Sequence, residues 1–250
     1  MAEPIEAQGF QPTEHDNRHL FEIKDTLSKG KGVFAVQHIP RGTLILSETP
    51  LLQAPNRIAA AQAFLELSIP KQKAYLQLHG MLSVDSFVNE QISDLTCKIA
   101  SIYQMNTFGD AVLELASRFN HSCIPNTQLA NPADGTKTYE FFVIRDIVAG
   151  EELCVAYTHP FMTRAERQRS LQHWVFHCQC PACEDTDEGQ QKEDKFAAMT
   201  ALHHELDKES LTNMTYDEAV VVHTRKLPKL QKLTGLMRSL GLLSVDILKQ

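Results

Sequence analysis

Three cysteines lie within six residues in the segment HCQCPAC, at Cys178, Cys180 and Cys183. Thiolates spaced this tightly are typical of a structural zinc site, which is tetrahedral and closed and therefore needs a fourth ligand. A ligand from outside the triplet would tie two parts of the chain together, and this requirement constrains the fold. The alternative, three free thiols on a loop, would leave reactive side chains accessible.

The fourth ligand has four candidates in the sequence: Cys97, Cys123, Cys154 and His177. Cys97 lies in a helical pattern and Cys154 in an alternating strand pattern, and a buried cysteine usually behaves as a small apolar residue. Cys123 lies in FNHSCIPN (residues 119–126), which holds more functional groups than a turn requires. We favour Cys123, and the other candidates stay open.

A length of 250 residues is enough for one sizeable core, or for one main domain with an appendage. The hydrophobic share of 43% and the charged share of 22% are ordinary for a globular protein. Of the net charge of -7, residues 184–210 hold nine acidic residues against three lysines. The remainder is nearly neutral and offers no basic patch for nucleic acid. We interpret the acidic stretch as a solvated linker or helix face.

Membrane insertion is not expected, since no stretch approaches the roughly 20 apolar residues that span a bilayer. The first residues, MAEPIEAQGFQPTEHDN, are acidic and lack the apolar core of a signal peptide. We therefore expect a soluble protein of the nucleus and/or the cytoplasm. Cysteines in those compartments are mostly reduced, which favours metal binding over disulfides.

Hydrophobic periodicity predicts β-strands at both ends of the main domain and helices between and after them. Thr163 and Glu166 fit a capping box, so a helix should begin at residue 164. Pro228 is expected to bend or interrupt the helix around it. The predicted elements are a three-stranded meander over 19–48, a helical insertion over 51–105, a short helix over 109–119, strands within 138–147 and 151–158, and helices over 193–250 with breaks at 210–215 and Gly241.

Two further motifs are weak when taken singly. In SKGKGVFA, Gly30 and Gly32 flank Lys31 between two predicted strands, which fits a tight hairpin or a close approach to a ligand. The order of strand, glycine turn and helix that marks a dinucleotide site is missing. GEELCVAY, residues 150–157, is compatible with an ordinary hairpin.

The ordered set KGKGVFA, RFNHSCIPN, GEELCVAY and CxCxxC, across residues 29–183, resembles the SET-domain protein lysine methyltransferases and looks closest to their SET-and-MYND branch. This resemblance implies an α+β, mainly β, SET fold, with small antiparallel sheets around a pseudoknot, a helical insertion, a zinc-binding post-SET segment and C-terminal helices. The implied division is a SET domain over 18–160 with its insertion at 51–105, a helix and post-SET zinc-binding segment over 161–184, and an acidic linker with C-terminal helices over 185–250.

The resemblance also implies S-adenosylmethionine as cofactor and one structural Zn²⁺. Tyr157 would be the catalytic residue and would line the lysine channel together with Phe108. The implied cofactor-binding residues are Lys31, Gly32, Asn106, Asn120, His121, Tyr157 and Phe176, and the implied metal ligands are Cys123, Cys178, Cys180 and Cys183.

The chain departs from the SET-and-MYND branch, whose MYND zinc module is rich in Cys and His, because residues 51–105 contain one cysteine, Cys97, and one histidine, His79, and so lack that module. We expect a monomeric lysine methyltransferase that acts on a histone or another protein, with no nucleic-acid or membrane partner. One alternative is a weakly active or inactive SET-fold interaction module. Another is a cysteine hydrolase with Cys123 and His121, which is disfavoured because a nucleophile and its base usually meet through the fold.

Overall fold

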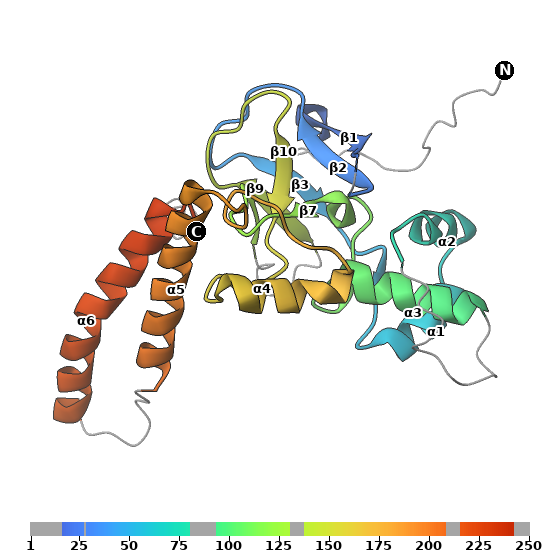
Figure 1. Cartoon of the computed structure of the whole chain (residues 1–250). Helices are drawn as coiled ribbons and strands as arrows, with labels where there is room; N and C mark the ends of the chain where they lie inside the picture. Colours follow the sequence, from blue (N-terminus) through green and yellow to red (C-terminus); the bar gives the residue numbers. More distant parts are fainter. Residues whose placement is uncertain (1–16, 28, 81–93, 131–137, 209–215, 243–250) are drawn as a thin grey trace.

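The computed structural model describes residues 17–27, 29–80, 94–130, 138–208 and 216–242. Small β-sheets form the centre of the molecule, with helices α1 to α3 on one side and the pair α5 and α6 on the other (Figure 1). Helix α4 runs beneath the sheets between these two helical parts. The arrangement agrees with the predicted α+β, mainly β, fold.

The first sheet brings together strands that are far apart in the sequence. Its order is β1–β2–β10–β7, in which β10 is antiparallel to β2 and parallel to β7. The parallel pair places FNHSCIPN directly beside GEELCVAY. The strands are β1 (Phe21–Asp25), β2 (Lys31–Ala35), β7 (Asn120–His121) and β10 (Glu152–Val155).

Two further sheets complete the β-structure, with orders β3–β9–β8 and β4–β6–β5. Their strands are β3 (Leu44–Glu48), β4 (Leu52–Gln53), β5 (Thr107–Phe108), β6 (Ala111–Val112), β8 (Thr127–Ala130) and β9 (Tyr139–Val143). The predicted strands exist, but the meander over 19–48 is wrong because β3 pairs with β9 and not with β2. The turn at Gly42, whose N–H donates to the carbonyl of Val143, directs β3 toward β9.

Apolar side chains from the first two sheets share one core. Val33 of β2, Ile45 of β3, Phe141 of β9 and Leu153 of β10 are all fully buried in it. The stacked rings of Phe119 and Phe141, with centroids 5.4 Å apart, lie in the same core. FNHSCIPN therefore begins inside the main core, which fixes the position of the residues that follow it.

The helical insertion is confirmed as α1 (Arg57–Leu65), α2 (Ile69–Leu76) and α3 (Asp94–Asn106). The predicted helix over 109–119 is wrong: this segment contains β6 and a single 3₁₀ turn, η3 (Ala116–Arg118). Glu48 provides the reason, since its carboxylate accepts hydrogen bonds from the N–H groups of Leu115 and Ala116. A long-range side chain thus caps the turn.

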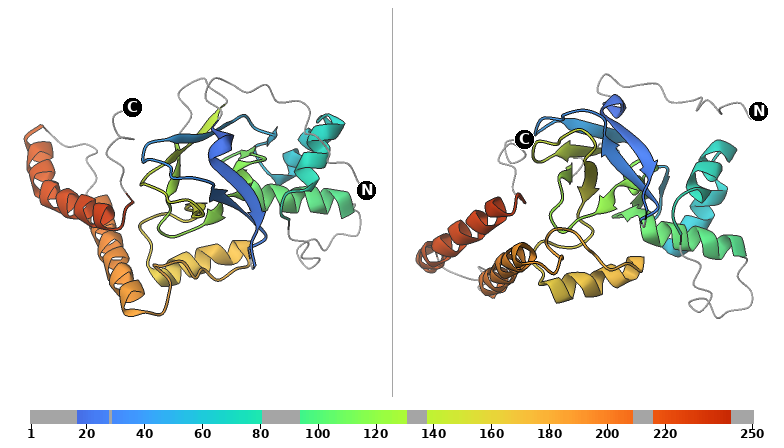
Figure 2. Two further views of the ribbon diagram at one scale, coloured as in Figure 1. Left: turned by 90° about the horizontal axis from the view of Figure 1, so that it is seen from above. Right: turned by 45° about the horizontal axis from the view of Figure 1, so that its top comes forward.

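The C-terminal third is helical. Helix α4 (Arg164–Leu171) begins at the predicted residue with the predicted capping box, and the 3₁₀ turn η4 (Gln172–Trp174) follows it. The acidic stretch is mostly helical, since it forms α5 (Asp187–Asp207), which packs beside α6 (Tyr216–Ser239) as an extended hairpin (Figure 2).

Pro228 lies within α6, and the assigned helix continues through it. The predicted break at 210–215 lies outside the described residues, whereas Gly241 follows α6 with a φ of 71°. None of the helices in the described part of the chain has the length and apolar character needed to cross a membrane.

Candidate active site and metal centre

The two glycines of KGKG meet different physical needs. Gly30 has a φ of 71°, in the left-handed region that favours glycine, and open space where a Cβ would stand. Gly32 is needed for room, because a Cβ there would lie 2.7 Å from Oε1 of Glu152 and 3.0 Å from Nδ2 of Asn120. Of the two, Gly32 marks the close approach to neighbouring functional groups.

Asn120 lies beside Gly32 because β7 and β2 flank β10 in the same sheet. Its amide nitrogen donates to Oε1 of Glu152 at 2.7 Å and to the carbonyl of Lys31 at 3.1 Å. Lys29 also pairs with Glu152, at 2.8 Å. The predicted residues Lys31, Gly32 and Asn120 are therefore neighbours, but the Lys31 side chain itself extends outward to Asp25.

His121 connects the tyrosine of GEELCVAY with a cysteine of FNHSCIPN. Its Nδ1 accepts a hydrogen bond from the backbone N–H of Tyr157 at 3.0 Å, which leaves the ring proton on Nε2, 3.3 Å from Sγ of Cys123. Burial lowers the pKa of His121 to about 4. The ring is therefore a neutral structural link at ordinary pH.

Tyr157 sits in a cluster of aromatic rings. Its ring lies 5.0 Å from that of Trp174, 5.3 Å from His121 and 6.5 Å from Phe176. Its hydroxyl donates to the carbonyl of Phe119 at 2.7 Å. Burial raises the pKa of Tyr157 above its usual range, so the phenol keeps its proton.

Trp174 links this aromatic cluster to α3, which carries the predicted residue Asn106. The indole N–H of Trp174 donates to the carbonyl of Met105, next to Asn106. Asn106 is buried and its amide donates to the carbonyls of His79 and Ile102. Phe108 packs edge-on against Phe141, with centroids 5.6 Å apart. Their predicted roles toward cofactor and lysine stay predictions.

The structure brings the four predicted metal ligands together. The sulfur atoms of Cys123, Cys178, Cys180 and Cys183 all lie within 4.8 Å of one another, and we call this group the four-cysteine cluster. A tetrahedral zinc with bonds of about 2.3 Å would have its sulfurs about 3.8 Å apart. The observed spacing of 3.9 Å between Cys123 and Cys178 fits that geometry. No group that includes Cys97, Cys154 or His177 qualifies as a metal site within the described residues.

Arg167 of α4 supports the interpretation of these cysteines as thiolates. Its Nε donates to Sγ of Cys123 at 3.2 Å, and the side chain is 1% exposed. A guanidinium donates hydrogen bonds and cannot accept them, so it favours an anionic sulfur. The donor set and this contact both fit a bound Zn²⁺, which would be held entirely by protein sulfur.

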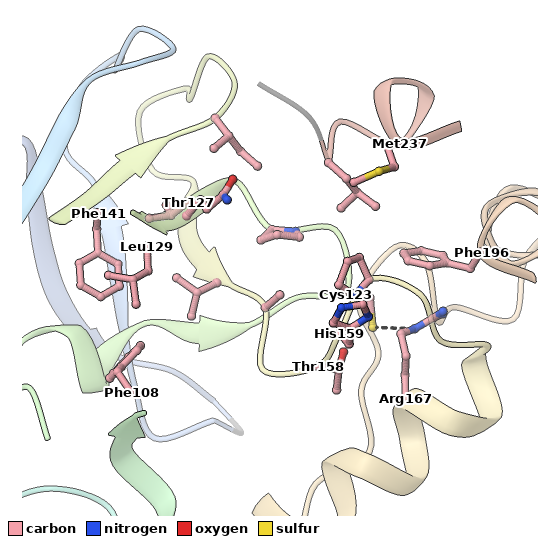
Figure 3. Close-up of a pocket in the computed structure, with 17 residues that line it drawn as sticks. Phe108, Cys123, Thr127, Leu129, Phe141, Thr158, His159, Arg167, Phe196 and Met237 are labelled. Atoms are coloured by element: carbon pink, nitrogen blue, oxygen red, sulfur yellow. Dashed lines mark hydrogen bonds between the residues drawn. The ribbon is translucent and has the colours of Figure 1, made fainter. Parts of the chain in front are cut away.

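Two cavities flank these groups. One of about 380 Å³ lies between the sheets and the C-terminal helices, and Phe108, Leu129 and Phe141 line one side of it (Figure 3). Cys123, Arg167, Phe196 and Met237 line the other side. The second cavity, of about 390 Å³, is lined by Gln168, Gln172, Val175, Phe176 and His177.

Three residues of this region are not among those predicted from the sequence: Glu152, Trp174 and Arg167. Trp174 is the single tryptophan and stands two residues before Phe176, which was an available signal. Val175 between them has a φ of 55°, an uncommon conformation for a β-branched residue. Glu152 and Arg167 carried no local signal, because their partners are distant in the sequence.

Comparisons with known proteins agree with this geometry. The family model "SET domain" matches residues 30–158, which is more than half of the chain. Histone-lysine N-methyltransferase SET5 of Meyerozyma guilliermondii is 41% identical over 85 residues, covering 33% of this chain and 18% of that protein. Histone-lysine N-methyltransferase set5 of Schizosaccharomyces pombe is 30% identical over 169 residues, covering 66% and 50%.

Protein-lysine N-trimethyltransferase SMYD5 of Mus musculus is 28% identical over 106 residues, covering 40% of this chain and 24% of that protein. The chain thus spans between 18% and 50% of the length of these three relatives. The resemblance found in the sequence motifs is confirmed by the family model and by the small sheets of the fold. The chain belongs to the SET domain family.

Proposed function

We propose that this protein transfers a methyl group from S-adenosylmethionine to a lysine side chain of a protein substrate, with Tyr157 at the reaction centre. One observation carries the proposal. The sheet order β2–β10–β7 gathers Gly32, Asn120 and His121 beside Tyr157, although they come from three distant motifs. Relatives named as histone-lysine and protein-lysine methyltransferases support the same reaction class.

The cofactor would be held where backbone and polar groups lie close together. When bound, S-adenosylmethionine would supply the methyl group on a positively charged sulfur. The missing side chain of Gly32 leaves room there, and Asn120 offers an amide that now contacts Glu152. Phe176, which is 38% exposed beside the second cavity, offers an apolar surface for an adenine ring. Asn106 and Lys31 would contribute through the backbone around them.

Tyr157 would orient the reacting amine and would not act as a base. The hydroxyl of Tyr157 donates its proton in a hydrogen bond to the carbonyl of Phe119. The lone pairs of the hydroxyl oxygen therefore remain available to accept a hydrogen bond. A lysine with a pKa of about 10.4 must lose its proton before it attacks, which costs roughly 4 to 5 kcal/mol near pH 7. The apolar rings of Phe108 and Trp174 would lower this cost by disfavouring the charged ammonium.

The zinc would be structural, because four cysteine ligands leave no open coordination position for catalysis. It would join FNHSCIPN to the segment that carries Phe176, and so would hold both sides of the cofactor pocket. Histones and other proteins with accessible lysines are the proposed substrates, and the nucleus and the cytoplasm are the compartments that hold them.

The test is incorporation of labelled methyl groups into histones and into a proteome extract. We expect Tyr157→Phe to lose at least about 100-fold in rate, as expected when an aligned hydrogen-bonding group is removed from a reaction centre. Tyr103→Phe is the matched control, since this buried tyrosine also donates to a carbonyl, that of Ala54, but lies in the helical insertion. It should keep full activity.

Binding of the cofactor is measured separately from transfer. Trp174 is the single tryptophan and lies against Tyr157, so its fluorescence should change when S-adenosylmethionine binds. Wild type and Tyr157→Phe should bind with similar affinity. Binding without transfer to any substrate pool would favour the interaction module, and the absence of both would refute the proposal.

A further inference from the structure

Arg167 is the largest fully buried side chain among the described residues, and its position needs an explanation. Besides the contact with Cys123, its guanidinium donates to Oε2 of Glu193 at 2.9 Å and to the carbonyl of Met162 at 2.7 Å. A second sulfur, that of Cys183, lies 4.0 Å from its terminal nitrogen. A buried charge is tolerated when it is paired and hydrogen-bonded.

The partners of Arg167 belong to two separate parts of the molecule. Cys123 and Cys183 belong to the four-cysteine cluster, whereas Glu193 and Phe196 belong to α5. The guanidinium lies 3.9 Å from the ring centroid of Phe196, so charge and stacking both hold the helix. The same side chain therefore bridges the cluster and the C-terminal helical hairpin.

The bridge has a charge pattern that suits a metal–thiolate group. Cysteines bind metals as thiolates, and Zn²⁺ with four thiolates carries a net charge of about -2. Arg167 brings one positive charge to this group, and Glu193, with 15% side-chain exposure, offsets that charge on the far side. Glu193 also accepts a hydrogen bond from the backbone N–H of Arg164, which fixes its carboxylate against α4.

We propose that Arg167 contacts the metal–thiolate group from outside its ligand set and makes the docking of α5 depend on the bound metal. The proposal rests on the metal site of the proposed function and does not require methyl transfer. Without the metal, Arg167 would lose the anionic sulfurs on one side, and Glu193 would be its remaining charged partner. The contact that orders α5 against the body would then weaken.

The cavity of about 380 Å³ makes this coupling relevant to access. Arg167, Phe196 and Met237 form its wall on the helical side, opposite Phe108 and Phe141 (Figure 3). Release of α5 would carry α6 with it, because the two helices pack together in one hairpin. The bound metal would thus keep the helical wall of this cavity in place, opposite Phe108.

The first experiment measures the rate at which the zinc-loaded full chain loses zinc to excess chelator, with a colorimetric indicator. Groups that hydrogen-bond metal ligands typically change metal affinity by 10- to 100-fold when removed. We expect Arg167→Met to lose zinc at least about 10-fold faster than wild type. Arg169→Met, a charge removal at an exposed position of the same helix, should stay within about twofold.

Arg167→Lys separates charge from packing. It keeps the positive charge but lacks the planar fork, so an intermediate rate is expected. Arg167→Met keeps much of the side-chain volume. If Arg167 acted through packing alone, this variant would lose zinc at the wild-type rate. If Arg167→Met does not fold, Glu193→Gln tests the same bridge from α5, with a smaller increase expected.

The second experiment measures amide hydrogen exchange of α5 in the full chain, with and without zinc, under reducing conditions. Removing zinc from wild type should speed exchange in α5 by at least about 10-fold. Arg167→Met should show fast exchange in α5 even with zinc bound. Unchanged exchange in wild-type α5 after zinc removal would overturn the proposal, whereas failure to bind any zinc would refute the metal site itself.

Discussion

Gly30 and Gly32 are two residues apart, yet substitution should affect different properties. Gly32→Ala places a methyl group 2.7 Å from Glu152 and 3.0 Å from Asn120, so both side chains must move. We expect its affinity for S-adenosylmethionine to fall about 10-fold or more, which corresponds to about 1.4 kcal/mol. Titration calorimetry with the cofactor measures this change.

Gly30→Ala is the control for that substitution. Its φ of 71° strains any residue with a Cβ, while the space around it is open. It should lower the free energy of unfolding by about 1 kcal/mol and leave cofactor affinity intact. Equal losses of affinity in the two variants would mean that Gly32 contributes only to the hairpin.

Glu48 gives a prediction for pH dependence away from the cysteines. Burial raises the pKa of this carboxyl above its ordinary value of 4.5, although hydrogen bonds from Leu115 and Ala116 oppose the shift. The folded state therefore binds a proton more tightly than the unfolded state does. Protonation of Glu48 therefore raises the free energy of unfolding at low pH. This stabilisation is lost as the pH rises through the raised pKa of the folded state.

The measurement is urea unfolding of wild type and Glu48→Gln between about pH 7.5 and 5. The free energy of unfolding of wild type minus that of the variant should grow as the pH is lowered, because only wild type gains the proton. A difference that shrinks on acidification would indicate a lowered pKa and contradict the assignment.

Helix α4 depends on its first turn. The side chain of Thr163 accepts a hydrogen bond from the N–H of Glu166, and the Glu166 carboxylate accepts one from the N–H of Thr163. Thr163→Ala should therefore lower the free energy of unfolding by about 1 kcal/mol. Urea unfolding measures this change. Thr163→Ser keeps a hydroxyl and should recover most of the lost free energy of unfolding. A serine variant as unstable as the alanine variant would exclude capping as the cause.

Elements with local signals were predictable from sequence, and elements set by distant partners were not. The start of α4 follows from residues three apart, and the insertion helices follow from their periodicity. A 3₁₀ turn at Ala116–Arg118 replaces the helix that the sequence pattern predicts, because Glu48, nearly 70 residues earlier, caps it. The pairing of β3 likewise depends on β9, which lies far along the chain.

At the scale of the molecule, the ordered motifs predict which residues form the candidate site. They do not predict how the segments between the motifs pack. The polar surroundings of Cys123 and the family resemblance both favour it as the fourth ligand, and the structure places it with the cysteine triplet. Glu152 and Arg167 could not be found in this way. Each forms an ion pair that exists only after strands or helices from different parts of the chain have packed.

The four-cysteine cluster joins Cys123 to Cys178, 55 positions later in the sequence, so metal loss should affect the whole molecule. We expect wild type to bind one zinc per chain, and Cys123→Ser to lose it and unfold at lower temperature. Cys97→Ser is the matched control, because Cys97 lies in α3, outside the cluster, and should keep the metal. Metal content by mass spectrometry and thermal unfolding check both. Full zinc content in Cys123→Ser would exclude Cys123 as a required ligand, and packing within their shared apolar cluster would then be what joins FNHSCIPN to the cysteine triplet.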